Sequence, residues 1–257
     1  MNILWNNQWV KPEEAVIPLH SEAVMYGLGA FETLRANLGG EIIKPEAHIN
    51  RLFLSLDSIE LSHSYAKEEV LLMLRRVAEK GKSTMQRMKI MVVPEGIAVT
   101  SEVLIIDPTI YNGIALKSVV QHRPLPNVKS LSYLECLLSY REAIKAGYFE
   151  ALMVGLEGEV YEGSRSNIFW FEGDILHTRD TGVLPGITRQ LVLDQSPFDI
   201  EYSITNLDDL KTKDEVFITS STLGIVPVSK IDDAIIQDDT FQHTGKIWNI
   251  IQKKIYK

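Results

Sequence analysis

The stretch EVYEGSRSNIFWFEGDILHT, residues 159–178, decides the fold of the second half of the chain. Its apolar residues form two short runs on either side of Glu172-Gly173-Asp174, which predicts two strands joined by a tight turn. Directly before the first run stands a carboxylate, Glu162, followed by small or polar residues at 163–167. Such residues make a poor core, so we expect the carboxylate to meet a cation or a hydrogen-bond donor.

Length and composition bound the class of protein. The chain has 257 residues, enough for one large domain or two modest ones, and 45% of them are apolar. A net charge of -8 argues against a nucleic-acid partner. No apolar run approaches the roughly 20 residues that span a membrane, and the first residues lack the features of a signal peptide. With Cys136 as the single cysteine, we expect a cytoplasmic protein without disulfides or bound metal, of the α/β or α+β type.

Hydrophobic periodicity predicts a mixed order of strands and helices. Strands are predicted at 3–10 (a hairpin around Asn6-Asn7), 26–36, 41–44, 87–94, 101–107, 114–120, 149–155, 167–178, 215–219 and 224–229. Helices are predicted from Pro45 to about Ile59, at 68–80, at 133–146, from near Thr188 and from about Thr244. Turn residues in DPTIYNG, 107–113, mark a boundary. We therefore expect a small domain at 1–107, an interdomain loop at 108–115 and a larger domain at 116–257.

A lysine and two hydroxyl-bearing segments accompany the carboxylate at 162. Lys129 stands in NVKSLSYLECLL, where the ordinary reading is a lysine solvated by its flexible stem. In LPGITRQLVL, 184–193, a Gly-Ile-Thr enters a helix, so free N–H groups and a hydroxyl point at whatever lies there. FITSSTLG, 217–224, offers further hydroxyls after a strand. Each segment alone is typical of a plain helix cap or turn.

Together these groups match the needs of one cofactor, pyridoxal phosphate (PLP). PLP requires an amine for a Schiff base, a cradle for its phosphate, and an acid facing the pyridine nitrogen. On this interpretation Glu162 keeps the ring nitrogen protonated. The small residues after it would let the cofactor approach the backbone closely.

Six motifs in order make the chain resemble the fold-type IV PLP enzymes, the class IV aminotransferase family. They are YGLGAFETLR, HINRL, KSLSYL, YEGSRSNIF, LPGITR and VFITSSTLGIVPV, and they cover nearly the whole chain. The family includes branched-chain aminotransferases, D-amino-acid aminotransferases and aminodeoxychorismate lyases. The resemblance implies an α+β architecture with a small N-terminal α/β domain and a larger C-terminal pseudobarrel domain. It also implies PLP between the domains, and a homodimer.

The resemblance also implies roles for individual residues. Lys129 matches the catalytic Schiff-base lysine, which also shuttles a proton. Arg51 matches a phosphate-binding arginine; without the motif, it would be a solvent-facing helix residue. Tyr133 lies near the cofactor in several members, or is a core aromatic, and Asn167 either ends a strand or supports the site from behind. The implied cofactor-binding residues are Arg51, Lys129, Tyr133, Glu162, Leu184 (against the ring), Ile187, Thr188, Ser220 and Ser221.

The sequence departs from the family patterns where they recognise substrate. Many members carry Asp-Arg-Gly where this chain has Ser21, Glu22 and Ala23. Branched-chain enzymes use Tyr-x-Arg on a strand that corresponds here to RMKIM, so Arg87 and Lys89 become the candidates. D-amino-acid enzymes have an arginine- and histidine-bearing loop, whereas VVPEGIAVTSEV, 92–103, has neither residue. Further candidates for substrate contacts are Tyr26 and Thr222.

Three functions remain open from the sequence. The first is transamination between an amino acid and a 2-oxo acid, and the second is β-elimination from aminodeoxychorismate to 4-aminobenzoate and pyruvate. The third is a catalytically silent homologue, against which the intact Lys129, Glu162 and Arg51 argue. Competing motifs are absent from the sequence, since it has no Gly-x-Ser-x-Gly elbow, no His-Glu-x-x-His and no Walker loop.

Overall fold

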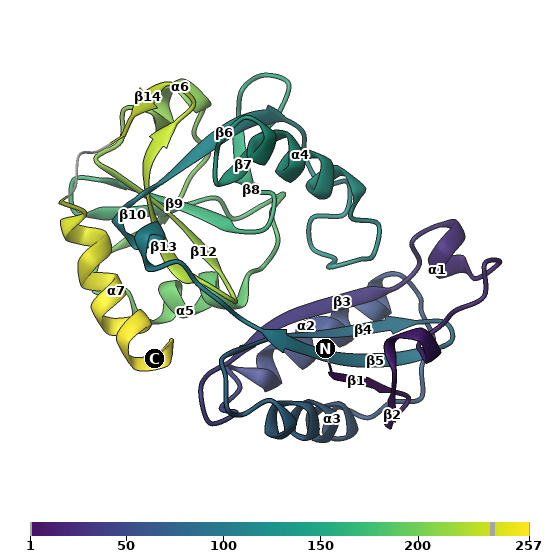
Figure 1. Ribbon diagram of the computed structural model, residues 1–257. Helices are drawn as coiled ribbons and strands as arrows, with labels where there is room; N and C mark the ends of the chain where they lie inside the picture. Colours follow the sequence, from purple (N-terminus) through teal and green to yellow (C-terminus); the bar gives the residue numbers. More distant parts are fainter. Residues whose placement is uncertain (1, 237–239, 257) are drawn as a thin grey trace. The chain divides into compact units, whose positions relative to one another are not determined.

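Two compact units make up the chain in the computed structural model, which describes residues 2–236 and 240–256 (Figure 1). The first unit is Met1–Ile105 with Val128–Tyr133, and the second is Ile106–Asn127 with Leu134–Lys257. The predicted interdomain loop at 108–115 contains the 3₁₀ helix η2 (Pro108–Asn112) and the start of strand β6 (Ile114–Val120). The structure therefore differs from the predicted ranges chiefly in residues 128–133, here called the lysine segment, which pack within the first unit.

The first unit contains a five-stranded antiparallel sheet in the order β2-β1-β5-β4-β3. Its strands are β1 (Asn2–Trp5), β2 (Gln8–Val10), β3 (Ala30–Ala36), β4 (Gln86–Val93) and β5 (Gly96–Val103). The predicted hairpin around Asn6 and Asn7 is confirmed, and both asparagines take the positive φ that such a turn requires.

Two predicted strands of the first unit differ from the structure in their bounds. The predicted pairing of 87–94 with 101–107 is present as β4 with β5, but β4 turns back after only two residues, so its partner begins at Gly96 and ends at Val103. The one at 41–44 is reduced to a single bridge between Ala36 and Ile42. In both places the apolar residues indicated a strand, but the neighbouring strand determined where the strand begins and how long it is.

Helices α2 (Pro45–Ser58) and α3 (Lys67–Lys80) confirm two predictions, and they pack on one face of this sheet. The core between sheet and helices includes Leu34, Leu52, Leu74, Met88 and Ile90. Side chains of a strand alternate between the faces. Along β3, Ala30, Glu32 and Leu34 therefore face α2, and Phe31 faces the other way. The unit also has two short helices, η1 (Pro12–Glu14) and α1 (Glu22–Met25).

The second unit is built on one large sheet of nine strands within the described residues. The order is β11-β10-β9-β12-β13-β6-β7-β8, with β14 paired to β13. The remaining strands are β7 (Glu150–Val154), β8 (Val160–Gly163), β9 (Asn167–Glu172), β10 (Ile175–Thr178), β11 (Ile200–Tyr202), β12 (Glu215–Ser220), β13 (Gly224–Ile231) and β14 (Ala234–Ile235). Strands β8 and β9 are far apart in this order yet contact each other, so the sheet curls.

The hairpin predicted from residues 167–178 is confirmed as β9 and β10, turning at Gly173. Its side chains Phe169, Trp170 and Phe171 are fully buried, together with Phe217 of β12. The sequence missed β8, the short strand that carries Glu162. That strand has only four residues, of which Val160 and Tyr161 are the apolar ones, so its sequence showed no clear alternation.

Helices of the second unit are α4 (Leu134–Lys145), α5 (Ile187–Gln195), α6 (Leu207–Leu210) and α7 (Gln242–Ile255). Three of them, α4, α5 and α7, confirm predicted helices. Helices α5 and α7 contact each other, and both contact β12. Within the described part of the chain, every helix is too short or too polar to cross a membrane, and His, Cys, Asp and Glu side chains form no group that could hold a metal ion.

Candidate active site

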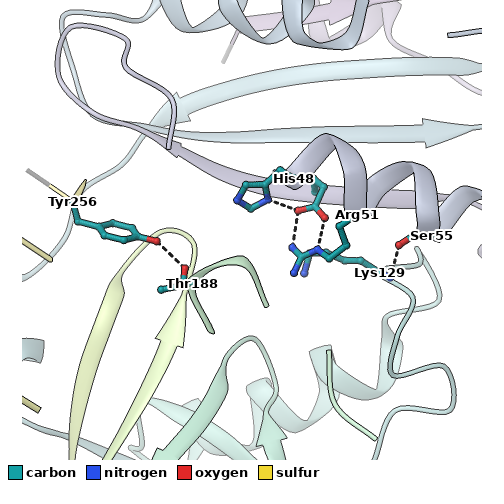
Figure 2. A network of polar contacts seen from close by, with 7 residues as sticks. His48, Arg51, Ser55, Lys129, Thr188 and Tyr256 are labelled. Atoms are coloured by element: carbon teal, nitrogen blue, oxygen red, sulfur yellow. Dashed lines mark hydrogen bonds and ion pairs between the residues drawn. The ribbon is translucent and has the colours of Figure 1, made fainter. Parts of the chain in front are cut away.

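A buried ion pair joins Arg51 of α2 to Glu32 of β3 in the first unit (Figure 2). Arg51 donates from Nε to Glu32 Oε1 at 2.7 Å and from Nη2 to Glu32 Oε2 at 2.8 Å. His48 Nδ1 lies 2.7 Å from the same Oε2. Arg51 is 7% exposed and Glu32 is fully buried, so the alternative reading of Arg51 as a solvent-facing residue is wrong. Arg51 and His48 share a face of α2 because they are three positions apart along the helix.

Opposite effects set the charges of Glu32 and His48. Burial alone would raise the pKa of Glu32, but the Arg51 guanidinium and the hydrogen bonds from Arg51 and His48 hold that pKa far below its usual range. Burial lowers the pKa of His48, Glu32 opposes this, and the positive charges of Arg51 and Lys129 lower it further. His48 is therefore neutral at pH 7, and because Glu32 is an acceptor, the ring carries its proton on Nδ1.

The lysine segment pairs with the edge of β3, which places Lys129 beside the triad. Phe31 donates its N–H to the Lys129 carbonyl at 2.9 Å, and Ala30 bridges to Ser130 in antiparallel fashion. Lys129 donates its own N–H to Ser55 Oγ of α2 at 3.2 Å (Figure 2). Gly29 makes this approach possible, since a Cβ there would lie 2.6 Å from the Leu131 side chain.

Three of the predicted site residues lie near the ring of Phe31. Lys129 Nζ lies 4.6 Å from the ring centroid and Lys89 Nζ lies 5.2 Å from it. Tyr133 packs edge-on against the same ring, with centroids 5.4 Å apart. Two amine-bearing side chains beside one aromatic ring suit an anionic ligand, because an anion near them would offset the repulsion between their charged forms.

The other substrate candidates of this unit differ in their surroundings. Arg87 is engaged with Glu102 through Nε at 2.7 Å and Nη2 at 2.6 Å, and this pair is exposed. Partial burial of the Lys89 amine, and then the neighbouring Arg87, lower the pKa of Lys89. Tyr26 ends helix α1 and is 74% exposed. The structure therefore brings Lys89 to Lys129, and it does not bring Tyr26 or Arg87 into the same contacts.

In the second unit, hydrogen bonds and an ion pair hold the carboxylate of Glu162 in place. Its Oε2 accepts from the backbone N–H of Leu184 at 3.0 Å and from Asn167 Nδ2 at 3.2 Å. Asn167 Nδ2 also donates to the Leu184 carbonyl at 2.8 Å, so Asn167 links the carboxylate of Glu162 to the backbone at Leu184. Arg123 Nη1 lies 3.6 Å from Glu162 Oε1. A carboxylate that is 3% exposed thus meets a cation and donors, which answers the question raised by its sequence.

A second carboxylate, Glu150 on β7, holds the loop that follows Glu162. It accepts from the Arg165 N–H at 2.6 Å and from Ser164 Oγ at 3.3 Å. Burial raises the pKa of Glu150, although Arg165 and the loop hydrogen bonds oppose this. A Cβ at Gly163 would lie 2.1 Å from Ser166 Oγ, so packing within the fold itself already requires that glycine.

The two hydroxyl segments lie at the ends of α5 and β12. Thr188 is the second residue of α5, whose first turn receives no side-chain cap from Gly186. Thr188 Oγ1 lies 2.7 Å from the hydroxyl of Tyr256, and both residues are buried (Figure 2). Ser220 ends β12, and its Oγ accepts from the Leu223 N–H at 3.4 Å. Within the same two segments, Ile187, Ser221 and Thr222 are half-buried.

Sequence reasoning missed several residues of these groups. Phe31 and Glu32 stood inside the quoted motif YGLGAFETLR, and His48 stood inside HINRL, so those motifs carried a usable signal. Arg123 and Tyr256 lay outside every motif, and no sequence signal pointed to them.

Comparison with known proteins decides the family. Residues 29–231 match the model of the family described as amino-transferase class IV. The chain belongs to the class IV aminotransferase family. Members of this family are PLP-dependent aminotransferases or lyases, so the protein is an enzyme of one of these two kinds.

Relatives with different activities resemble the chain to similar degrees. It is 30% identical to the D-alanine aminotransferase of Listeria monocytogenes, over 93% of this chain and 90% of that protein. It is 26% identical to the aminodeoxychorismate lyase of Bacillus subtilis, over 97% of this chain and 93% of that protein. The solved branched-chain amino acid aminotransferase of Escherichia coli superposes with a TM-score of 0.88 at 22% identity, covering 99% of this chain and 94% of that one. This likeness confirms the predicted fold-type IV class.

Proposed function

We propose that the protein is a PLP-dependent aminotransferase that moves an amino group between an amino acid and a 2-oxo acid. The observation that carries this proposal is the placement of Lys129 beside the Glu32–His48–Arg51 triad and over Phe31. The donor sets of both units fit PLP: an amine and an arginine in the first, a buried carboxylate and two hydroxyl segments in the second. When bound, PLP supplies an electron sink for a carbanion at the substrate Cα.

Lys129 supplies the amine that links to the cofactor aldehyde and then carries a proton to and from the substrate Cα. Its backbone is fixed on both sides, by Phe31 N–H and by Ser55 Oγ, so the amine is aimed from a rigid base. Both roles use the free electron pair of the amine, first to bind the aldehyde carbon and then to take the Cα proton.

Arg51 is the proposed phosphate donor of the first unit. The planar fork of a guanidinium suits both a carboxylate and a phosphate. Glu32 fixes the plane of that fork with two hydrogen bonds, and His48 fixes Glu32. The triad therefore holds the orientation of Arg51 before any ligand arrives, which lowers the entropy cost of binding.

Glu162 is the proposed partner of the pyridine nitrogen. Its network with Leu184 N–H and Asn167 Nδ2 holds one carboxylate oxygen, Oε2, in a fixed place. Arg123 supplies a positive charge near the other oxygen, Oε1. An ionised carboxylate at this position stabilises a protonated ring nitrogen, which is what an electron sink requires. Leu184 is the proposed apolar contact with the ring.

Ile187, Thr188, Ser220 and Ser221 are the proposed phosphate donors of the second unit. Thr188 lies in the uncapped first turn of α5, where backbone N–H groups and the helix dipole favour an anion. Ser220 stands at the end of β12, where the chain turns toward Gly224. Thr222 and Tyr133 stay predicted contacts of the substrate and the cofactor respectively.

Lys89 is the better of the two proposed cations for a substrate carboxylate. Arg87 already holds Glu102 with two nitrogens, whereas Lys89 lies over the same ring as Lys129. Burial lowers the pKa of Lys89, and a substrate carboxylate beside it would stabilise its charged form. A homodimer and a cytoplasmic location stay predictions.

Elimination from aminodeoxychorismate is the second candidate, because the lyase of Bacillus subtilis resembles nearly the full length of the chain. Both reactions use the same lysine and carboxylate. They differ in their products: transamination gives a 2-oxo acid, whereas elimination gives 4-aminobenzoate and pyruvate. An amino-acid screen separates them: the cofactor-loaded protein is mixed with single L- and D-amino acids, and conversion to the pyridoxamine form is followed by absorbance. Release of 4-aminobenzoate and pyruvate from aminodeoxychorismate, without such conversion by any amino acid, would establish the lyase instead.

The linking lysine is tested by borohydride reduction of the cofactor-loaded protein and peptide mapping. We expect the label on Lys129, and we expect Lys129→Arg to lose both label and activity. Lys145→Arg, at the exposed end of α4, is the matched control and should keep both. A label on Lys89 or Lys145 would overturn the assignment.

A further inference from the structure

Helix α7 contacts both hydroxyl segments of the second unit through polar side chains. Near its C-terminal end, Tyr256 places its hydroxyl 2.7 Å from Thr188 Oγ1 of α5. One turn earlier, Gln252 Oε1 accepts from the Ile225 N–H at 3.1 Å, and Gln252 Nε2 donates to the Leu223 carbonyl at 3.0 Å. One helix thus fixes both elements from which the proposed phosphate donors come.

Gln252 is built into the turn between β12 and β13. A Cβ at Gly224 would lie 1.9 Å from Gln252 Oε1, so the turn closes around the amide and needs the glycine there, at a φ of +74°. The hydroxyl of Tyr111 donates to the same Leu223 carbonyl at 2.9 Å and accepts from Gln252 Nε2 at 3.2 Å. Gln252 is 4% exposed, so these bonds are shielded from water and the turn has little freedom.

The number of hydrogens on each hydroxyl determines how Tyr256 can act on Thr188. A hydroxyl carries one hydrogen, so it can donate one hydrogen bond while it accepts others. A phosphate dianion only accepts, so a phosphate contact uses the hydrogen of Thr188. Tyr256 must then be the donor in its hydrogen bond to Thr188 Oγ1. The pair therefore forms a relay in which Tyr256 orients Thr188 toward the ligand and strengthens its donor.

We propose that Tyr256 and Gln252 are positioning residues for the cofactor phosphate, each acting through a neighbouring segment. This inference rests on the proposed function, because it needs the phosphate of PLP at these segments. It adds α7 to the site, although no motif reaches this helix. The competing explanation is that α7 only packs on the core, since its own side chains Ile247 and Ile251 are fully buried. A packing role alone would not depend on whether the ligand carries a phosphate.

The test compares PLP with pyridoxal, which has the same aldehyde and ring but no phosphate. Dissociation constants of both are measured by equilibrium dialysis for the wild-type protein, Tyr256→Phe and Gln252→Met. For each variant we expect the Kd of PLP to rise by about two- to tenfold, the scale of one hydrogen bond. The Kd of pyridoxal should not change, because the link to Lys129 and the contact with Glu162 are common to both ligands.

Tyr148→Phe is the matched control. It removes another hydroxyl of the second unit, which donates to the Asp232 carbonyl at 3.1 Å. It should leave both constants unchanged. Equal weakening of both ligands in the two α7 variants, or no weakening of PLP in either, would overturn the positioning role. A wild-type protein that binds neither ligand would instead overturn the proposed function, and the inference with it. The two variants contact different segments, so if one fails to fold the other still decides the question.

Discussion

Replacing Arg51 by alanine is expected to destabilise the protein strongly, even before any cofactor is considered. Glu32 is fully buried, and both of its oxygens accept hydrogen bonds from Arg51. The variant leaves a buried carboxylate with a neutral His48 as its remaining partner in this triad. Breaking a buried pair in this way costs about 3–5 kcal/mol of unfolding free energy.

The measurement is urea unfolding of cofactor-free protein at pH 7.5, for the wild type, Arg51→Ala and two comparison variants. Arg87→Ala breaks an ion pair in the same unit whose side chains are 51% and 41% exposed, so it should cost less than about 1 kcal/mol. The double variant Glu32→Gln with Arg51→Met removes both charges together, so it should cost less than Arg51→Ala. Cofactor affinity of Arg51→Ala should also fall, by about 1.5–3 kcal/mol, the scale of a charged hydrogen bond.

The penalty should also depend on pH in a definite direction. The folded pKa of Glu32 lies far below its unfolded value of 4.5, so the stability from this carboxylate is present above about pH 4.5. It is lost as the pH falls toward the folded pKa. The difference between wild type and Arg51→Ala should therefore be full at pH 7.5 and shrink below pH 4.5. A cost for Arg51→Ala no larger than that of Arg87→Ala at pH 7.5 would refute the reasoning.

Two further expectations concern the second unit. Glu162→Gln keeps the shape of the side chain but removes its charge. The protein should still bind PLP, while turnover should fall by about tenfold or more, which is at least ~1.4 kcal/mol of barrier. Steady-state kinetics at measured full cofactor occupancy test this, and unchanged turnover would rule out the pyridinium role. His243 lies 3.0 Å from both Glu215 and Asp174, and although burial alone would lower its pKa, these two hydrogen bonds raise it. The stability that protonated His243 adds is therefore fully present below the unfolded pKa of about 6.5, and it is lost as the pH rises through the folded pKa. His243→Asn should therefore lower the melting temperature more at pH 6 than at pH 9. An equal drop in melting temperature at the two pH values would contradict the argument.

Local sequence was sufficient for most elements that frame the site. The apolar period of α2 predicted its length to within about one residue, and Asn6-Asn7 and Gly173 marked two hairpins. Six motifs in order were sufficient for the family and for proposing Lys129 and Glu162 as its chemical centre. These features depend on residues close together in the chain, where period and turn chemistry are decisive.

Only the tertiary structure decided which side chains meet across long separations. Period two on β3 allowed Glu32 to face either side, and packing against α2 placed it against His48 and Arg51. The lysine segment joined the first unit because its backbone found an unpaired edge at β3, which no local pattern reveals. Tyr256 met Thr188 across 68 residues, through the docking of α7 on α5 and β12. A sequence pattern fixes the face that a residue presents, whereas its partner depends on which elements pack together, and that is settled by the burial of the whole core.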